Sequence, residues 1–180
     1  KVRLEAERAT LVEGKGTVRL YGAVEANSKD FHIKTQDVTY FTSEDRMKSN
    51  SPISFRKYSI GPEGEKNLSL SLKGSDSSAD LTLKKITIRK NPVMKLFGVS
   101  EDFLAGGSEK SSPKNKKANV TIKASKKLVY DHPARQAVFT GDVKVVGDGK
   151  TLRCRELTVS VRIDDADGKK ETQRLMVAIM

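Results

Sequence analysis

The chain has 180 residues, of which 34 are basic and 23 acidic, so its formal net charge at pH 7 is +11. A chain of this length forms one domain, or two small ones, with enough residues for a hydrophobic core. Hydrophobic residues make up 36% of the chain and recur at regular spacing, which excludes a wholly disordered protein.

The ends and the cysteine content restrict the class further. No stretch approaches the roughly 18 to 20 apolar residues of a membrane-spanning helix. The chain begins at Lys1 with neither a methionine nor an apolar leader, so we expect a processed or trimmed protein. Cys154 is the single cysteine, which excludes an internal disulfide and a cysteine-based zinc site but leaves the compartment open.

Apolar residues occupy every second position through most of the chain, a pattern typical of strands with one buried face. In chain order, the alternation covers residues 2–6, 18–26, 33–40, 68–72, 81–88, 120–130, 137–145, 157–163 and 175–179. Turn-forming residues separate these runs at 13–16, 61–64, 147–149 and 164–168. We therefore predict an all-β, mostly antiparallel protein of roughly ten to fourteen strands, whose sheet folds over its apolar face as a sandwich, jelly roll or open barrel.

The alternation stops between residues 98 and 119, where Gly, Ser and Lys predominate. We predict an N-terminal segment 1–98, a flexible linker or loop 99–117, and a C-terminal segment 118–180 that continues the same sheet. The lysine-rich stretch 110–127 is either a solvated loop and the wet face of a strand or an anion-binding surface.

Residues 18–40 align without a gap with residues 137–159, at a shift of 119 positions. Gly22 then corresponds to Gly141, and in both copies an acidic residue changes the parity of the alternation. A one-residue slip of this kind predicts a β-bulge or corner that bends the sheet.

The second copy carries the motifs of a known family. An apolar-x-Tyr-Asp strand end at residues 128–131 precedes Arg-x-Ala-x-x-x-Gly-x-Val at 135–143, and a Leu-x-x-x-x-Leu-x-Val strand follows at 152–159. This arrangement resembles the OstA-like repeat of lipopolysaccharide-export proteins, and residues 18–57 are similar to the LptC-type arrangement of the same superfamily. The resemblance implies an open β jelly roll in the periplasm, with or without a membrane tether outside this sequence. It also implies that an apolar groove binds lipopolysaccharide or a related glycolipid and passes it onward, and the motifs do not distinguish which member this is.

The implied binding site is the apolar side of the folded sheet. Each residue proposed to line the groove is also a candidate core residue. They are Leu20, Val24, Ile33, Val38, Tyr40, Ile53, Phe55, Leu70, Leu72, Leu83, Ile86, Val143, Leu152, Leu157 and Val159. For the anionic head group we propose Lys114, Lys116, Lys117 and Lys123 at the groove mouth.

The implied partners are other β jelly-roll proteins of the export bridge, which would dock by their sheet edges or ends, and a membrane-anchored ABC transporter complex. The apolar stretch 174–180 is either a strand that pairs with such a partner or the ordinary closing strand of the sheet.

Motifs for covalent chemistry are missing, so we expect no enzyme and no cofactor or metal. Neither histidine belongs to a zinc motif, and no nucleophile elbow occurs. Lys144 stands where a phosphate-binding loop needs its first glycine, so a hairpin turn explains residues 147–151 better. The acidic stretch 164–168 lacks the later glutamate of a calcium loop, and Cys154 fits a small buried filler.

Two alternatives remain open. A basic β-barrel can bind nucleic acid, although aromatic residues for base stacking amount to only 6% of the chain. A non-transporting envelope scaffold would use the same fold only to dock partners, and the sequence does not separate it from a lipid carrier.

Overall fold

The structure is a computed structural model that describes residues 3–12, 14, 16–61, 65–80, 82–100, 117–147, 149–164 and 172–179. These residues form one 13-stranded sheet in which neighbouring strands pair antiparallel. The predicted all-β antiparallel class and the strand count are confirmed. Among the described residues there is no helix long and apolar enough to cross a membrane.

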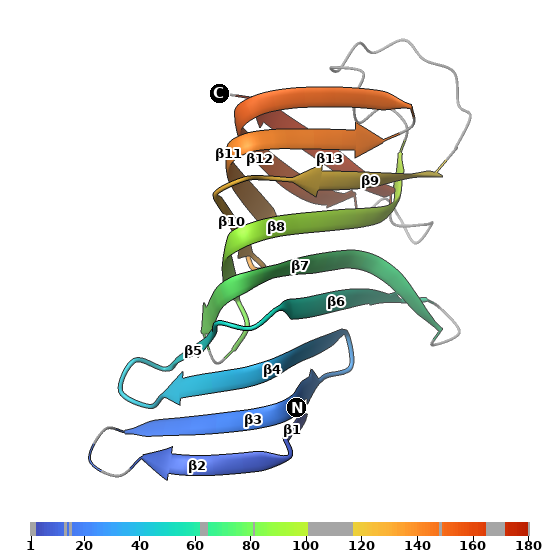
Figure 1. The fold of residues 1–180 in the computed structure, drawn as a ribbon. Coiled ribbons are helices and arrows are strands. Elements are labelled where there is room, and N and C mark those ends of the chain that lie inside the picture. Colours follow the sequence, from blue (N-terminus) through green and yellow to red (C-terminus); the bar gives the residue numbers. More distant parts are fainter. Residues whose placement is uncertain are drawn as a thin grey trace.

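The strands follow the sequence in a continuous meander (Figure 1). The first seven are β1 (Arg3–Glu5), β2 (Arg8–Val12), β3 (Thr17–Asn27), β4 (Phe31–Phe41), β5 (Arg46–Ser49), β6 (Ile53–Ile60) and β7 (Lys66–Asp80). The others are β8 (Lys85–Ser100), β9 (Lys117–Lys123), β10 (Lys127–Asp131), β11 (Gln136–Gly147), β12 (Lys150–Asp164) and β13 (Thr172–Ile179). The N- and C-terminal strands lie at opposite ends of the stack.

The sheet is folded into two layers. Long strands run through both layers, and short strands pair with them in one layer only. Each pair of short strands, such as β1 and β2, lies end to end along one long strand: β1 pairs with residues 25–27 of β3, and β2 pairs with residues 17–21. We call layer A the half formed by β1, β6, β9 and the parts of the long strands paired with them. Layer B is the half formed by β2, β5, β10, β13 and their partners.

The long strands bend where they pass from one layer to the other. Register shifts mark this bend between Tyr21 and Val24 in β3 and between Thr140 and Val143 in β11. Gly141 lies within the second shift with φ of 92°, and a Cβ there would lie 2.9 Å from the backbone nitrogen of Lys126. A larger residue would therefore meet backbone as well as an unfavourable conformation.

The predicted repeat is confirmed by the strand pairing. In β3 and β4, Val24 pairs with Thr35, and the equivalent residues Val143 and Cys154 pair in β11 and β12. The equivalence extends beyond the predicted alignment, because β2 and β10 pair with β3 and β11 in the same register at the same shift of 119. The predicted bulge is present in both copies.

The chain around the predicted linker differs slightly from expectation. β8 continues to Ser100, and β9 already begins at Lys117, whereas we expected the alternation to stop between 98 and 119. A register shift between Leu96 and Val99 lets β8 continue past the expected boundary. β8 also pairs with both β9 and β10, so the hydrogen-bonded ladder is continuous from the first segment to the last, while the division into segments stays a prediction.

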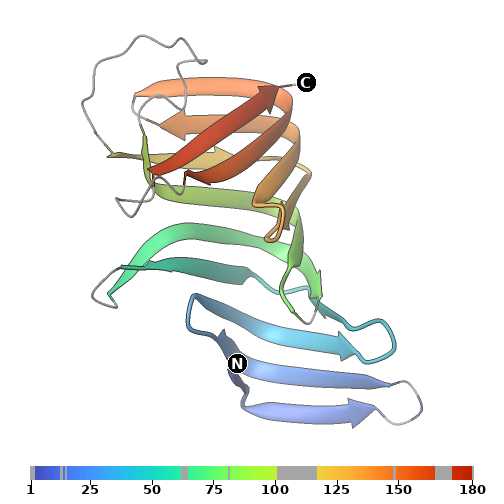
Figure 2. The same ribbon diagram turned by 180° about the vertical axis from the view of Figure 1, so that it is seen from behind.

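The hydrophobic core lies between the layers and is concentrated in β6 to β12. Phe139, Leu128, Ile122 and Leu157 are fully buried there. Phe55 of layer A packs against Tyr130 of layer B with ring centroids 6.3 Å apart, so the two layers are in direct contact in the middle of the sheet. β13 pairs with β12 as an ordinary closing strand and comes close to β8, which closes the C-terminal end (Figure 2).

Candidate functional site

A groove remains open between the layers at the N-terminal end of the sheet, with a volume of about 570 Å³. That volume is within the range of about 300–1,000 Å³ typical of small-molecule sites. Both layers contribute to its wall. The lining residues are Leu4, Val24, Ala26, Ile33, Thr35, Val38, Met47, Lys48, Ser49, Ile53, Ser77, Ser78, Ala79, Thr82, Leu83 and Ile86.

Small side chains keep this end hollow. Ala26, in the groove wall, occupies the position where the second copy has the fully buried Val145. On layer B, the floor of the groove is formed partly by Ser77 and Ala79. Similar backbones therefore enclose a filled core at one end and free space at the other.

The polar groups in the groove wall are satisfied internally. The hydroxyl groups of Thr35 and Ser49 are hydrogen-bonded to each other at 2.9 Å. No buried side-chain nitrogen or oxygen of the described residues lacks a partner. The wall consequently offers few free donors or acceptors and favours an apolar ligand.

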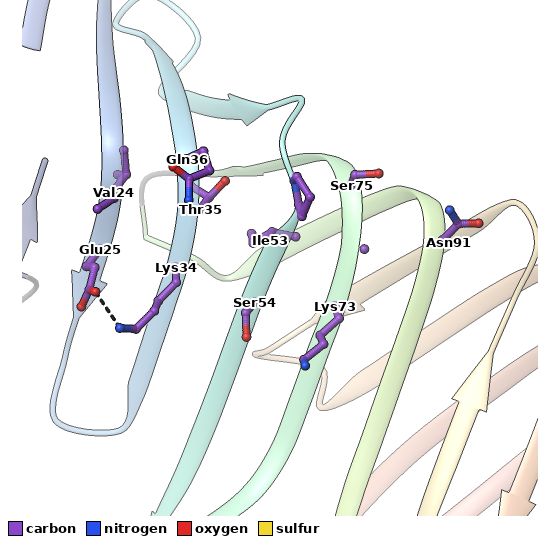
Figure 3. Close-up of a pocket in the computed structure, with 13 residues that line it drawn as sticks. Val24, Glu25, Lys34, Thr35, Gln36, Ile53, Ser54, Lys73, Ser75 and Asn91 are labelled. Carbon is purple, nitrogen blue, oxygen red and sulfur yellow. Dashed lines mark hydrogen bonds and ion pairs between the residues drawn. The ribbon is translucent and has the colours of Figure 1, made fainter. Parts of the chain in front are cut away.

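A second hollow, of about 630 Å³, lies at the bend and shares Val24, Thr35 and Ile53 with the groove. Figure 3 shows its charged and polar rim, where Lys34 Nζ donates to a carboxylate oxygen of Glu25 at 2.6 Å. That bond lowers the pKa of Glu25. Val24, Thr35 and Ile53 thus lie between the apolar groove and the second hollow with its polar rim.

An aromatic cluster borders the groove toward the filled core. Phe31 stacks on Phe55, Phe55 contacts Tyr130, and Tyr130 contacts His132. Lys57 Nζ donates to His132 Nε2 at 2.6 Å, which links layer A to the turn after β10 in layer B. Because this link lies on the side opposite the bend, it holds the two layers together where the folded sheet is otherwise open.

Burial determines the charge states of this cluster. It raises the pKa of Tyr130 to about 12. It also lowers the pKa of Lys57, and it lowers the pKa of His132, with the Lys57 ammonium adding to the effect. His132 is therefore neutral at pH 7 and can accept the hydrogen bond from Lys57.

We expect acidification to weaken the fold through His132. The pKa of His132 is about 6.5 in the unfolded chain and lower in the folded one, so the unfolded chain binds more protons as the pH falls from 6.5 toward the folded pKa, and stability is lost over that interval. The melting temperature should drop between about pH 7.5 and pH 5.

His132→Gln keeps an acceptor for Lys57 without titrating, so this variant should show a smaller drop. His32→Gln serves as the matched control, since His32 bonds to Glu25 outside the cluster. An identical pH profile for the wild type and His132→Gln would contradict the assignment.

The predicted lining residues fall into three groups. Those at the groove are Val24, Ile33, Val38, Ile53, Leu83 and Ile86. Those that are part of the buried core away from the groove are Phe55, Leu70, Leu72, Val143, Leu157 and Val159, with Leu152 partly buried against them. Leu20 is buried outside the core cluster, and Tyr40 is half-buried and donates to Asp45 at 3.0 Å.

The predicted head-group lysines are only partly described. Lys123 is exposed on the outer side of layer A, next to the buried Ile122. Lys117 is the first residue of β9. Lys114 and Lys116 lie outside the described residues, as do residues 165–168 of the acidic stretch 164–168.

The sequence analysis missed several lining residues. The inner side of β5 and β7 carries Met47, Ser49, Ser77 and Ala79 at alternate positions. Because three of these four side chains are small or polar, the sequence shows no apolar alternation there.

The hairpin interpretation of residues 147–151 is confirmed, because Gly147 pairs with Lys150. Cys154 packs partly buried against the core, and burial raises the pKa of its thiol.

Residues 1–85 match the family described as lipopolysaccharide-assembly, LptC-related. This match confirms the predicted relation to the LptC-type lipopolysaccharide-export proteins. The chain also aligns with the crystal structure of LptH, the LptA homologous periplasmic component of the lipopolysaccharide transport device from Pseudomonas aeruginosa. That alignment has 14% identity and a TM-score of 0.31, and it covers 100% of this chain and 95% of that chain. No curated protein sequence matches the chain.

Proposed function

Because residues 1–85 match the LptC-related lipopolysaccharide-assembly family, we propose that the protein binds lipopolysaccharide or a related glycolipid in the periplasm and passes it to a partner. The observation that carries this proposal is the apolar groove of about 570 Å³, which lies between the layers in the matched segment. The protein performs no covalent chemistry in this role and takes no cofactor. Any energy for transport comes from another protein, such as an ABC transporter complex.

The acyl chains would lie against the inner face of both layers. Val24 and Ile33 line the groove from layer A, whereas Val38 and Ile86 line it from layer B, with Leu83 in the turn before β8. Contact of the other predicted lining residues with lipid stays a prediction, because these residues do not line the groove.

The energetics require direct transfer between proteins. Burial of one acyl chain of about twelve carbons contributes on the order of 9 kcal/mol, at about 0.8 kcal/mol per methylene. At 1.4 kcal/mol per tenfold, release into water would be disfavoured by a factor of about a million. A carrier of this kind has to join its groove to a second apolar groove.

The N-terminal edge of the sheet suits such a junction. β2 pairs only with β3 among the described strands, so its other edge is free to accept a further strand. Leu4 and Leu11 next to this edge are 50% and 65% exposed. Docking of another β jelly roll here would cover both leucines and extend the groove, which begins at Leu4.

Site-specific photo-crosslinking tests the proposal. A crosslinking residue at Ile33 should form an adduct with lipopolysaccharide in cells that produce both, whereas one at Val138 should not. Val138 is the matched control, because it is a half-buried aliphatic residue on the outer side of layer B, between the inward-facing Ala137 and Phe139.

Equal adducts at Ile33 and Val138, or none at either, would count against a lipid-binding groove. A protein that still bound its partners under these conditions would then be an envelope scaffold.

A further inference from the structure

The outer face of layer A carries a row of basic residues that strand pairing brings together. The register joins Lys34 to Ser54, Ser54 to Lys73, Lys73 to Val93, and Val93 to Lys123. It then joins Lys123 to Lys144 and Lys144 to Arg153. We call Lys34, Lys73, Lys123, Lys144 and Arg153 the basic row. It spans seven neighbouring strands and extends over roughly 30 Å, since strands lie about 4.8 Å apart.

All members of the basic row are exposed. Lys34 is paired with Glu25 at 2.6 Å, and among the described residues the other four make no ion pair. Figure 3 shows the first part of the row, where Lys34, Ser54 and Lys73 lie on adjacent strands.

The charge differs between the two layers. In layer A the strand segments contain the acidic residues Glu5 and Glu25 at the N-terminal end, and Asp142 lies at the bend of β11, two residues before Lys144. In layer B, acidic residues occur along the sheet, at Asp37, Asp76, Asp80, Asp131 and Glu156. Basic residues occur in both layers, but fewer acidic residues offset them in layer A than in layer B.

Folding does not account for this arrangement. Like charges directly opposite each other on neighbouring strands destabilise a sheet, and Lys123, Lys144 and Arg153 are three such neighbours in succession. An anionic partner would offset the repulsion. The row contains no aromatic side chain for stacking bases, which disfavours nucleic acid.

We propose that the outer face of layer A binds the surface of a lipid bilayer through the phosphate groups of anionic lipids. A broad sheet face with a row of cations matches a plane of many phosphates, and each Lys or Arg near an anionic membrane adds to the attraction. The contact is peripheral and reversible, because exposed charges are screened by salt. It is separate from the groove and goes beyond the proposed function.

Vesicle co-sedimentation of the full chain tests this surface. Wild-type protein should bind vesicles of phosphatidylglycerol and phosphatidylcholine at low ionic strength but not vesicles of phosphatidylcholine alone, and about 0.5 M salt should release it. Lys123→Glu/Lys144→Glu should weaken binding at least about tenfold.

The matched control is Arg19→Glu/Lys127→Glu, which changes the net charge equally on the outer side of layer B, where both residues face threonines on neighbouring strands. This control should weaken binding less than about threefold. Ala79→Trp, which places a large ring in the groove, should bind vesicles as wild type does. A failure of the membrane-binding proposal can therefore be distinguished from a failure of the lipid-carrier proposal.

Three results would overturn the proposal: no binding of wild type to anionic vesicles, equal losses in both double variants, or tighter binding of single-stranded DNA than of vesicles by the same row. The unfolding midpoint of each variant shows whether the variant is folded. Lys123→Glu alone should unfold at a midpoint no lower than that of wild type, because it places opposite charges on neighbouring strands.

Discussion

Phe139→Ala is expected to lower the free energy of unfolding by about 3–5 kcal/mol. Phe139 is fully buried, and its ring lies in the core cluster between the two layers. Removing the ring loses its burial and leaves a cavity that closely packed neighbours cannot fill. Urea unfolding, with the midpoint and slope compared with those of wild type, measures the loss.

Leu20→Ala is the matched control, because Leu20 occupies the position of Phe139 in the first copy of the repeat. Leu20 is 9% exposed and lies outside the core cluster. The substitution should cost about 2 kcal/mol, because a leucine side chain is smaller than a phenylalanine ring and Leu20 lies outside the core cluster. A loss as large as that of Phe139→Ala would mean that Leu20 is packed as tightly as Phe139, which would contradict its place outside the core cluster.

The strand content follows from local pattern. Alternation of apolar and polar residues identified most strands, and the parity change after Thr35 and Cys154 located the bend, because a bulge leaves a trace in the sequence itself. The short strand at residues 8–12 was missed. Leu11 is 65% exposed there, so the strand has no buried face to create a clear pattern.

The hollow could not be predicted from the pattern. Alternation tells which side of a strand faces inward, but whether inward-facing residues touch depends on the sizes of residues from both layers. Ser77 and Ala79 create space only because Met47 and Ile86, on either side of Ala79, do not fill it. The predicted lining therefore mixed groove residues such as Ile33 with core residues of the same chemical type.

The basic row depends on register in the same way. Lys34 and Arg153 are far apart in the sequence, and no motif connects them. The lysine-rich stretch 110–127 is recognisable in the sequence because its charges lie close together along the chain. Of the proposed head-group lysines, only Lys123 lies in the basic row. Pairing across seven strands is what places these charges side by side.

Ala79→Trp is expected to block the groove and to reduce lipopolysaccharide binding by at least about a hundredfold. The indole ring would enter the hollow between β4 and β7 and occupy part of its volume of about 570 Å³. Excluding even four methylenes of an acyl chain costs about 3 kcal/mol, which is more than a hundredfold in affinity. Binding of purified lipopolysaccharide, followed by native mass spectrometry, measures the effect.

Thr87→Trp is the control for this substitution. Thr87 lies beside Ile86 in β8, and its side chain points to the outer face of layer B, so the same ring is added outside the groove. This variant should bind lipid as wild type does. If Ala79→Trp fails to fold, as judged by its unfolding midpoint, Ala79→Phe places a smaller ring at the same point. Undiminished binding by a folded groove variant would exclude this groove as the acyl-chain site, whereas loss in the groove variant alone would locate the lipid between the two layers.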